Sequence, residues 1–319
     1  MSRKRSIEKL SEEKEKLATS YYEYLLRLGY QGKSSKSRYH FLREYLQQQG
    51  CNQISTQLEK TTTQDIINYR NYLQQRESRN EANKPLSEKS IYTHLQNLRH
   101  FFEYLKEVNK LEINPFSSFK IESPKEEIAE RIILTQEEIQ ELYEVTENHQ
   151  ERALLSLGYG CGLRVGEMEN LEIEDIRIEE KTVVVKRGKG AKRRVVPMSE
   201  NVVNDLKSYY EKEYYSLTKG RNYNSTSKAF MLDSRGGKMK YYTYNKYLKK
   251  ILKRAFPPLG ETGKGVITIH NLRHSIATHF LEQGISVEQV RLFLGHSELE
   301  TTQIYTHISK KQLSKLTQK

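Results

Sequence analysis

Histidine, arginine and tyrosine side chains are concentrated between His270 and Tyr305 at a spacing that suits phosphate chemistry. His270 and Arg273 are three residues apart, so in a helix they share one face and can direct an imidazole and a guanidinium to the same anion. His296 follows a leucine and a glycine, and Tyr305 comes nine residues after it. The chain contains 22 tyrosines, so only its position distinguishes Tyr305.

A metal site is the alternative for the same stretch, because His270 and His274 have i,i+4 spacing. The segment HNLRH lacks the glutamate of an HExxH motif, and metal binding is therefore not expected.

A second candidate anion site is the segment GCGLRVGE, which contains Arg164 and Glu167. Its glycines allow the backbone to turn, and the arginine stands at the predicted start of a short helix, where N–H groups and a guanidinium both suit phosphate. The alternative is an ordinary Arg164–Glu167 pair on an exposed helix.

A basic turn joins two β-rich runs, 182–186 and 193–198. The pattern predicts a β-hairpin whose tip carries Lys189 between two glycines. That lysine can reach into a neighbouring groove, or it is simply an exposed turn residue.

These residues need supporting elements, and the sequence predicts two domains. Helical periodicity runs through residues 21–122, with a capping box at Thr62 and a capping serine at Ser87. Residues 1–20 are predicted to be a flexible basic arm, and the proline-containing stretch 123–130 a linker. Residues 131–319 form the second domain, which opens with a capping box at Thr135 and contains a basic helix over 241–256.

Charge and composition limit the class of protein. The formal net charge is +12, which favours a polyanionic partner, and the helix 241–256 could lie along a DNA backbone or be a solvated charged face. No apolar run approaches the length of a membrane span and no signal sequence is present, so a cytoplasmic protein without a membrane partner is expected. The two cysteines lie in no metal-ligand spacing, and no nucleotide-binding GxxxxGK[ST] loop occurs.

Taken together, the motifs GLRVGE, GKG, HNLRH, LGH and TTQIYTH resemble, in order and spacing, the signature of the tyrosine recombinase family, the phage integrases and Xer-type enzymes. The resemblance covers nearly the whole chain, although only the second domain carries specific motifs. Gly166 stands where many relatives carry serine or another small residue, which affects no catalytic assignment.

The resemblance implies a role for each matched residue. Tyr305 is the expected nucleophile that forms a 3′-phosphotyrosine, and Lys189 is the expected general acid for the departing 5′-hydroxyl. Arg164 and Arg273 are expected to clamp the scissile phosphate. His270 and His296 are expected to position the phosphate and Tyr305 or to exchange protons with them. Glu167 is expected to support Arg164.

The resemblance also implies the architecture and the partners. The expected fold is mainly α with a small antiparallel sheet: a helical core-binding domain and an α/β catalytic domain that form a C-shaped clamp on duplex DNA. The expected partners are a double-stranded recombination site and either further copies of the chain, as a tetramer in the synapse, or a paralogous recombinase. The short C-terminal tail is expected to dock in a neighbour, and a frayed end is the alternative. No cofactor, metal or ATP is expected.

Two other functions remain open at this point. One is a non-catalytic DNA-binding accessory protein with the same fold, and the other is topoisomerase-like relaxation of DNA. The sequence does not separate chromosome-dimer resolution from mobile-element integration, although the compact length favours an Xer-like enzyme.

Overall fold

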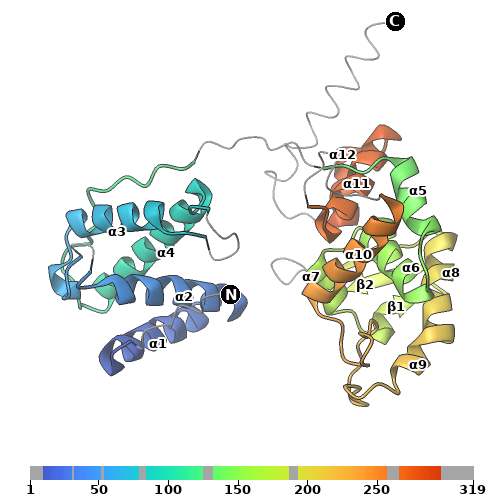
Figure 1. Cartoon of the computed structure of the whole chain (residues 1–319), viewed down its shortest axis with the longest axis horizontal. Helices are drawn as coiled ribbons and strands as arrows, with labels where there is room; N and C mark the ends of the chain where they lie inside the picture. Colours follow the sequence, from blue (N-terminus) through green and yellow to red (C-terminus); the bar gives the residue numbers. More distant parts are fainter. Residues whose placement is uncertain are drawn as a thin grey trace, which may run out of the picture. The chain divides into compact units, whose positions relative to one another are not determined.

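The structure is a computed structural model, and it describes residues 10–30, 32–51, 54–78, 84–124, 132–186, 193–256 and 266–295. The chain divides into two compact units, Met1–Ile128 and Ala129–Lys319 (Figure 1). Residues 125–130 of the predicted linker 123–130 lie outside the described residues.

The N-terminal unit is helical. Its elements are α1 (Glu12–Arg27), α2 (Gly32–Gln48), the short 3₁₀ turn η1 (Leu58–Lys60), α3 (Thr63–Gln75) and α4 (Glu88–Glu107). The capping signals read from the sequence are present: Thr62 and Asp65 form a capping box at α3, and the Ser87 side chain accepts from the Ser90 N–H at α4. Buried aromatic rings fill the core between the helices, among them Tyr45 and Tyr69, whose ring centroids are 5.0 Å apart.

The prediction of a flexible arm over residues 1–20 is wrong for its second half. Helix α1 begins at Glu12, where the Ser11 side chain accepts a hydrogen bond from the Lys14 N–H. Ala18 is buried on the face of α1 that meets the core, so packing of this helix overcomes its charged composition. Residues 1–9 lie outside the described part of the chain.

The second unit combines helices with a small sheet. In chain order its elements are α5 (Gln136–Glu144), α6 (His149–Leu155), the π turn η2 (Ser156–Gly160), α7 (Val165–Glu169), η3 (Ile173–Asp175), β1 (Ile176–Arg177), β2 (Thr182–Val185), β3 (Arg194–Pro197), α8 (Glu200–Tyr209), the π turn η5 (Tyr210–Tyr214), α9 (Tyr215–Leu217), α10 (Tyr241–Ala255), α11 (Ile269–Glu282) and α12 (Val287–Leu294).

The sheet has the order β1-β2-β3 with antiparallel neighbours, and Val183 pairs with Val196 across the hairpin. These two valines are fully buried in the core of the second unit. The predicted β-hairpin is therefore confirmed in its strands, and its tip, residues 187–192, lies outside the described residues.

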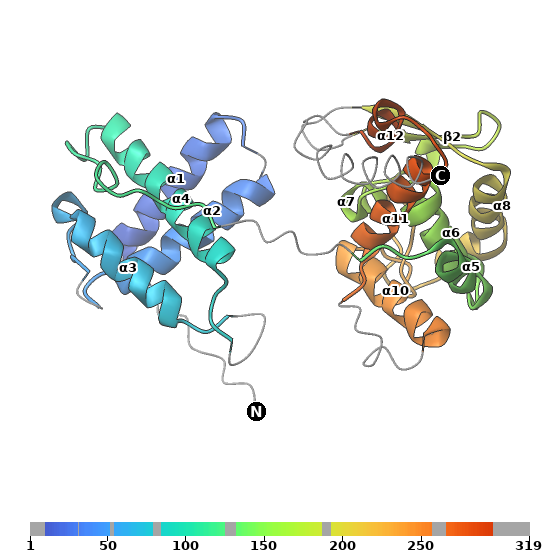
Figure 2. The same ribbon diagram turned by 90° about the horizontal axis from the view of Figure 1, so that it is seen from above.

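Helix α11 is the central support of the second unit (Figure 2). Its N-terminus is closed by Thr268 and Asn271, with the Thr268 N–H donating to Asn271 Oδ1 at 2.8 Å. Leu272 lies fully buried against η2, where a Cβ added to Gly158 would approach Leu272 Cδ1 to 3.1 Å. A glycine at residue 158 thus allows the close packing that fixes the position of α11.

The polar segment 215–227 begins with the short helix α9. Tyr214 is buried and donates its hydroxyl hydrogen to the Ala229 carbonyl at 3.1 Å, and this contact holds the preceding helical turn in place. Residues 229–232 are buried, with isolated β-bridges at Ala229 and Leu232.

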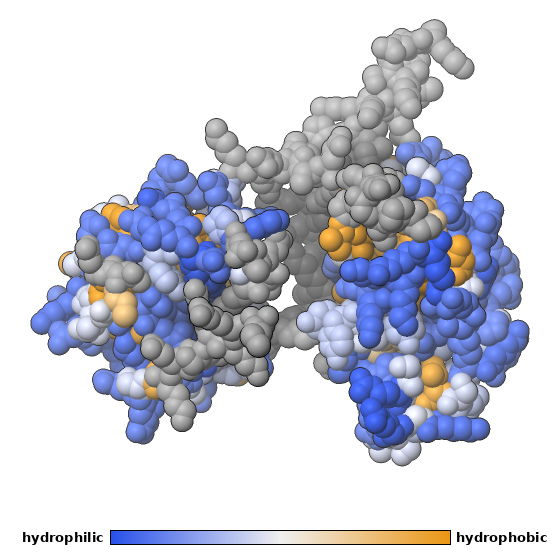
Figure 3. All heavy atoms as spheres, viewed as in Figure 1, coloured by the Kyte–Doolittle hydropathy of each residue, from blue (hydrophilic) through white to orange (hydrophobic). Residues whose placement is uncertain are grey.

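The fold class, mainly helical with a small antiparallel sheet, is confirmed for the chain, with the sheet in the second unit. Hydrophilic side chains predominate on the face shown in Figure 3, in agreement with a mean hydropathy of -0.81. None of the described helices combines the length and the apolar character needed to cross a membrane.

Candidate active site

Arg164 stands at the N-terminus of α7, as the sequence predicted. The chain reaches it through Gly162, whose φ of +57° favours glycine. A Cβ at Gly162 would lie 2.9 Å from Leu294 Cδ2, so this backbone passes directly beside the end of α12. The Arg164 N–H donates to Glu167 Oε2 at 2.8 Å, and its side chain is 23% exposed.

Arg164, Arg194 and Arg273 form a cluster around Glu167, because their guanidiniums surround its buried carboxylate. Oε1 lies 2.9 Å from Arg164 Nη1 and 2.7 Å from Arg194 Nη1, while Oε2 lies 2.8 Å from Arg194 Nη2. Arg273 Nη1 is 3.8 Å from Oε2. The predicted support of Arg164 by Glu167 is thus present as a contact, within a larger network.

The electrostatics of Glu167 follow from these contacts. Burial alone would raise the pKa of its carboxyl, but the hydrogen bonds and charge of Arg194, the Arg164 N–H and the charge of Arg273 outweigh it and lower the pKa to about 2. The carboxylate is therefore ionised throughout the neutral range, and it orders the guanidiniums around it.

Arg273 and His270 share helix α11 but differ in their exposure. The Arg273 side chain is only 5% exposed and donates from Nη1 to the Gly162 carbonyl at 2.5 Å and from Nη2 to the Leu294 carbonyl at 2.6 Å. His270 is exposed one turn earlier. Partial desolvation, then the charges of Arg273 and Arg164, lower the pKa of His270, which places the ring in the field of both arginines.

A metal site is not found among the described residues, where no group of three His, Cys, Asp or Glu side chains converges. His279, on the same helix, is buried, and its Nδ1 lies 2.8 Å from the Tyr159 hydroxyl. That histidine is a packing residue of the fold.

Arg194 is the functional candidate that the sequence reasoning missed. It is the first residue of β3, and its side chain is 10% exposed. The signal was available: strand alternation puts residue 194 on the same face as the buried Val196, and an arginine on an inward face needs an acidic partner.

Three predicted catalytic residues, Lys189, His296 and Tyr305, lie outside the described residues, as does the predicted docking tail 306–319. The strands on either side of Lys189 in the sequence are described. At the end of β2, Lys186 Nζ lies 2.7 Å from Glu172, 2.5 Å from Glu174 and 3.1 Å from Asp175.

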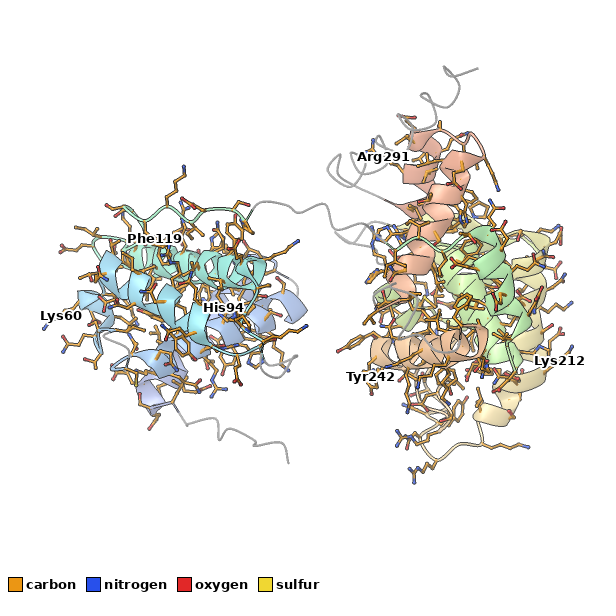
Figure 4. All side chains as sticks on the ribbon, turned by 45° about the horizontal axis from the view of Figure 1, so that its top comes forward. Lys60, His94, Phe119, Lys212, Tyr242 and Arg291 are labelled. Atoms are coloured by element: carbon orange, nitrogen blue, oxygen red, sulfur yellow. The ribbon has the colours of Figure 1, made fainter. Side chains whose placement is uncertain are left out.

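The basic helix predicted over 241–256 is α10, and it presents a charged face to solvent. Its buried side is formed by Tyr244, Leu248 and Ile251. Tyr242, labelled in Figure 4, is 63% exposed near the start of the helix. The exposed lysines of the helix are Lys246, Lys249, Lys250 and Lys253.

Comparison with known proteins assigns both units. The model of the Phage integrase family matches residues 133–312, and that of the Phage integrase SAM-like domain matches residues 9–121. The chain is 34% identical over 233 residues to tyrosine recombinase XerC of Oceanobacillus iheyensis, covering 72% of this chain and 73% of the relative. It is 33% identical over 236 residues to tyrosine recombinase XerA of Pyrococcus horikoshii, covering 72% of this chain and 75% of the relative.

Solved structures agree on the fold. The integrase of transposon Tn1549, in complex with circular intermediate DNA, matches with a TM-score of 0.66 and 19% identity, covering 91% of this chain and 94% of that chain. A lambda integrase dimer bound to a core site matches with a TM-score of 0.66 and 17% identity over the same shares of the two chains. One family model matches more than half of this chain, and both of these relatives are more than 30% identical to it. This chain therefore belongs to the phage integrase family of tyrosine recombinases.

Proposed function

We propose that this protein is a site-specific recombinase that cleaves and rejoins duplex DNA through a covalent 3′-phosphotyrosine at Tyr305. The observation that carries the proposal is the convergence of Arg164 and Arg273 on Glu167, with the His270 ring in the electrostatic field of the two arginines. The family to which the chain belongs supports the same reaction.

The charge of the cluster suits a phosphate that gains negative charge in the transition state. Three guanidiniums and one carboxylate give a net charge of +2. Arg164 is the most exposed of the three arginines and is the one we assign to direct contact with a non-bridging oxygen. Arg273 is more deeply buried, so its charge acts with little screening by water.

The proposed reaction begins with attack of the Tyr305 phenolic oxygen on the scissile phosphorus, while the phenol proton passes to a neighbouring histidine or to water. The bond from phosphorus to the 5′-oxygen breaks, and Lys189 supplies the proton that makes the leaving group a 5′-hydroxyl. His270, whose pKa is lowered in the free protein by partial desolvation and by the two arginines, can form a hydrogen bond or exchange a proton at the phosphate, and we assign the same role to His296. Rejoining reverses these steps with a 5′-hydroxyl as the nucleophile.

The phosphotyrosine retains the energy of the phosphodiester, so we propose that the reaction needs neither ATP nor a metal ion. The arginine charges supply the stabilisation that a metal would otherwise give. We therefore expect the same yield of covalent adduct in EDTA and in magnesium. A strict requirement for a divalent cation would contradict this mechanism.

The test is capture of the covalent adduct on a nicked suicide substrate. Because the target site is unknown, duplexes with randomised arms are first enriched for binding to the protein, and a nick is then introduced into the selected sequences. Wild type should give a slowly migrating protein–DNA band on a denaturing gel, and Tyr305→Phe should give none. Equal bands for both proteins, or none for wild type on a tightly bound site, would refute the assignment.

We further propose that four copies, or two copies with two of a paralogous recombinase, assemble on two sites. The dimer of lambda integrase on its core site supports assembly on DNA. Light scattering of the protein, mixed with one or two equivalents of DNA that carries the site, measures the number of protomers bound per site. The relatives named XerC and XerA favour an Xer-like role over mobile-element integration, and footprinting on repeats near the gene tests that choice.

A further inference from the structure

Arg194 connects the arginine–glutamate cluster to the end of α12. We propose that it is a positioning residue for DNA cleavage, which holds Glu167, and through it Arg164, in register with the segment that leads to His296 and Tyr305. This inference rests on the proposed recombinase function and deepens it.

The first observation is that one guanidinium contacts two elements. Two of its nitrogens, Nη1 and Nη2, bind the two oxygens of Glu167 on α7, at 2.7 and 2.8 Å. Its Nε donates to the Phe293 carbonyl on α12 at 3.3 Å. The two elements are far apart in sequence, so this side chain fixes their relative position in a way that no local interaction can.

The second observation concerns the chain as it leaves α12. Gly295 closes the helix with a φ of +67°. A Cβ at this residue would lie 2.5 Å from Arg194 Cδ and 3.0 Å from both Nε and Nη1. The backbone at Gly295 therefore passes over the Arg194 side chain, so the arginine packs against the last described residue before His296.

Arg273 makes the parallel contact from the other side. Its Nη2 donates to the Leu294 carbonyl, next to the Phe293 carbonyl that accepts from Arg194. The last carbonyls of α12 thus accept from two arginines, and both arginines lie against Glu167. A change at Arg194 would loosen Glu167 and the end of α12 together.

The contacts also distinguish Arg194 from a phosphate ligand. Its side chain is 10% exposed, and both Nη nitrogens face Glu167. DNA affinity should therefore depend little on this residue, whereas the rate of cleavage depends on the geometry that it maintains. Lysine keeps the charge but has a single nitrogen, which cannot bind both carboxylate oxygens and a carbonyl in this arrangement.

The experiment compares Arg194→Lys with wild type in the full chain. DNA affinity is measured by fluorescence anisotropy, and the single-turnover rate of adduct formation is measured on the suicide substrate at saturating protein. We expect unchanged affinity within about twofold and a rate lowered by about 10²-fold, the size of effect that a displacement near 1 Å produces. The matched control is Arg177→Lys. Arg177, on β1, forms an exposed ion pair with Glu180, so this substitution should change neither the affinity nor the rate.

A double-mutant cycle with Glu167→Gln tests whether Arg194 acts through Glu167. The double variant should lose no more rate than the slower single variant, because both changes interrupt one connection. A purely structural role predicts that affinity and rate fall together, with a lower fraction of folded protein, and that result would overturn the proposal. An undiminished rate in Arg194→Lys would also overturn it. Absence of adduct with wild type would instead count against the recombinase function itself.

Discussion

Replacing Glu167 by glutamine should destabilise the second unit by an amount that depends on pH. In the folded protein the pKa of Glu167 is about 2, against an ordinary value of 4.5. A difference of about 2.5 pKa units corresponds to about 3 kcal/mol at pH 7, since each unit is worth about 1.36 kcal/mol. Removal of one partner from a buried ion pair typically costs about 3–5 kcal/mol, which agrees with this figure.

The sign of the pH dependence follows from the lowered pKa. The stabilisation is fully present above about pH 4.5, where Glu167 is ionised in both the folded and the unfolded chain, and it is lost as pH falls through the folded-state pKa of about 2. At pH 3 the remaining contribution is about 1 kcal/mol. The difference in unfolding free energy between wild type and Glu167→Gln should therefore shrink by more than half between pH 7 and pH 3.

The assay must report on the second unit alone, because the chain contains two units. Urea unfolding at pH 7, 4 and 3 is followed by a brief hydrogen–deuterium labelling pulse at one fixed pH, and peptides from β2 are read by mass spectrometry. Glu180→Gln is the matched control, since Glu180 is 60% exposed in its pair with Arg177, and it should produce no measurable change.

Two results would refute the reasoning. If Glu167→Gln destabilised the unit no more than the control at pH 7, the arginine contacts would not stabilise the fold. If the loss were as large at pH 3 as at pH 7, it would come from packing of the side chain and not from its charge.

Further predictions concern other parts of the second unit and the thiols. Gly220→Ala should lower the unfolding free energy by about 1–3 kcal/mol, because its Cβ would lie 2.4 Å from backbone atoms, whereas Gly166→Ala, with open space around it, should be tolerated in the same urea assay. The imidazole of His270 should titrate below 6.5 in NMR spectra of the free protein, and its pKa should rise when a DNA phosphate offsets the neighbouring arginine charges; a value at or above 6.5 without DNA would contradict the cluster. A thiol reagent should modify the exposed Cys51 but not the buried Cys161, whose pKa is raised by burial to about 12, and rapid reaction of both thiols in native protein would contradict that burial.

Much of the fold could be predicted because it depends on local signals. The capping boxes at Thr62 and Thr135 start helices where the sequence placed them, and the valine-rich runs that contain Val183 and Val196 pair as expected. The prediction of a flexible arm over residues 1–20 relied on the charged composition of that segment alone. The helix that begins at Glu12 is stabilised by burial of Ala18 against helices later in the chain, which composition does not reveal.

In the candidate site too, local sequence signals predicted some features and the tertiary structure decided others. Residue types, order and spacing were enough to select Arg164, His270 and Arg273, because each lies at a helix start or on a helix face that local rules define. The roles of Lys189, His296 and Tyr305 remain predictions from the sequence and the family.

Only the tertiary structure decided how the cations are held. Glu167 and Arg194 are 27 residues apart, and Arg273 donates to a carbonyl 111 residues before it, so both contacts lie beyond the reach of helix or strand periodicity. These contacts depend on the packing of α7, β3, α11 and α12, which local propensity does not specify. The sequence by itself determined which groups can act on a phosphate, and the packing determined that Glu167 orders them and that Arg194 links them to the end of α12.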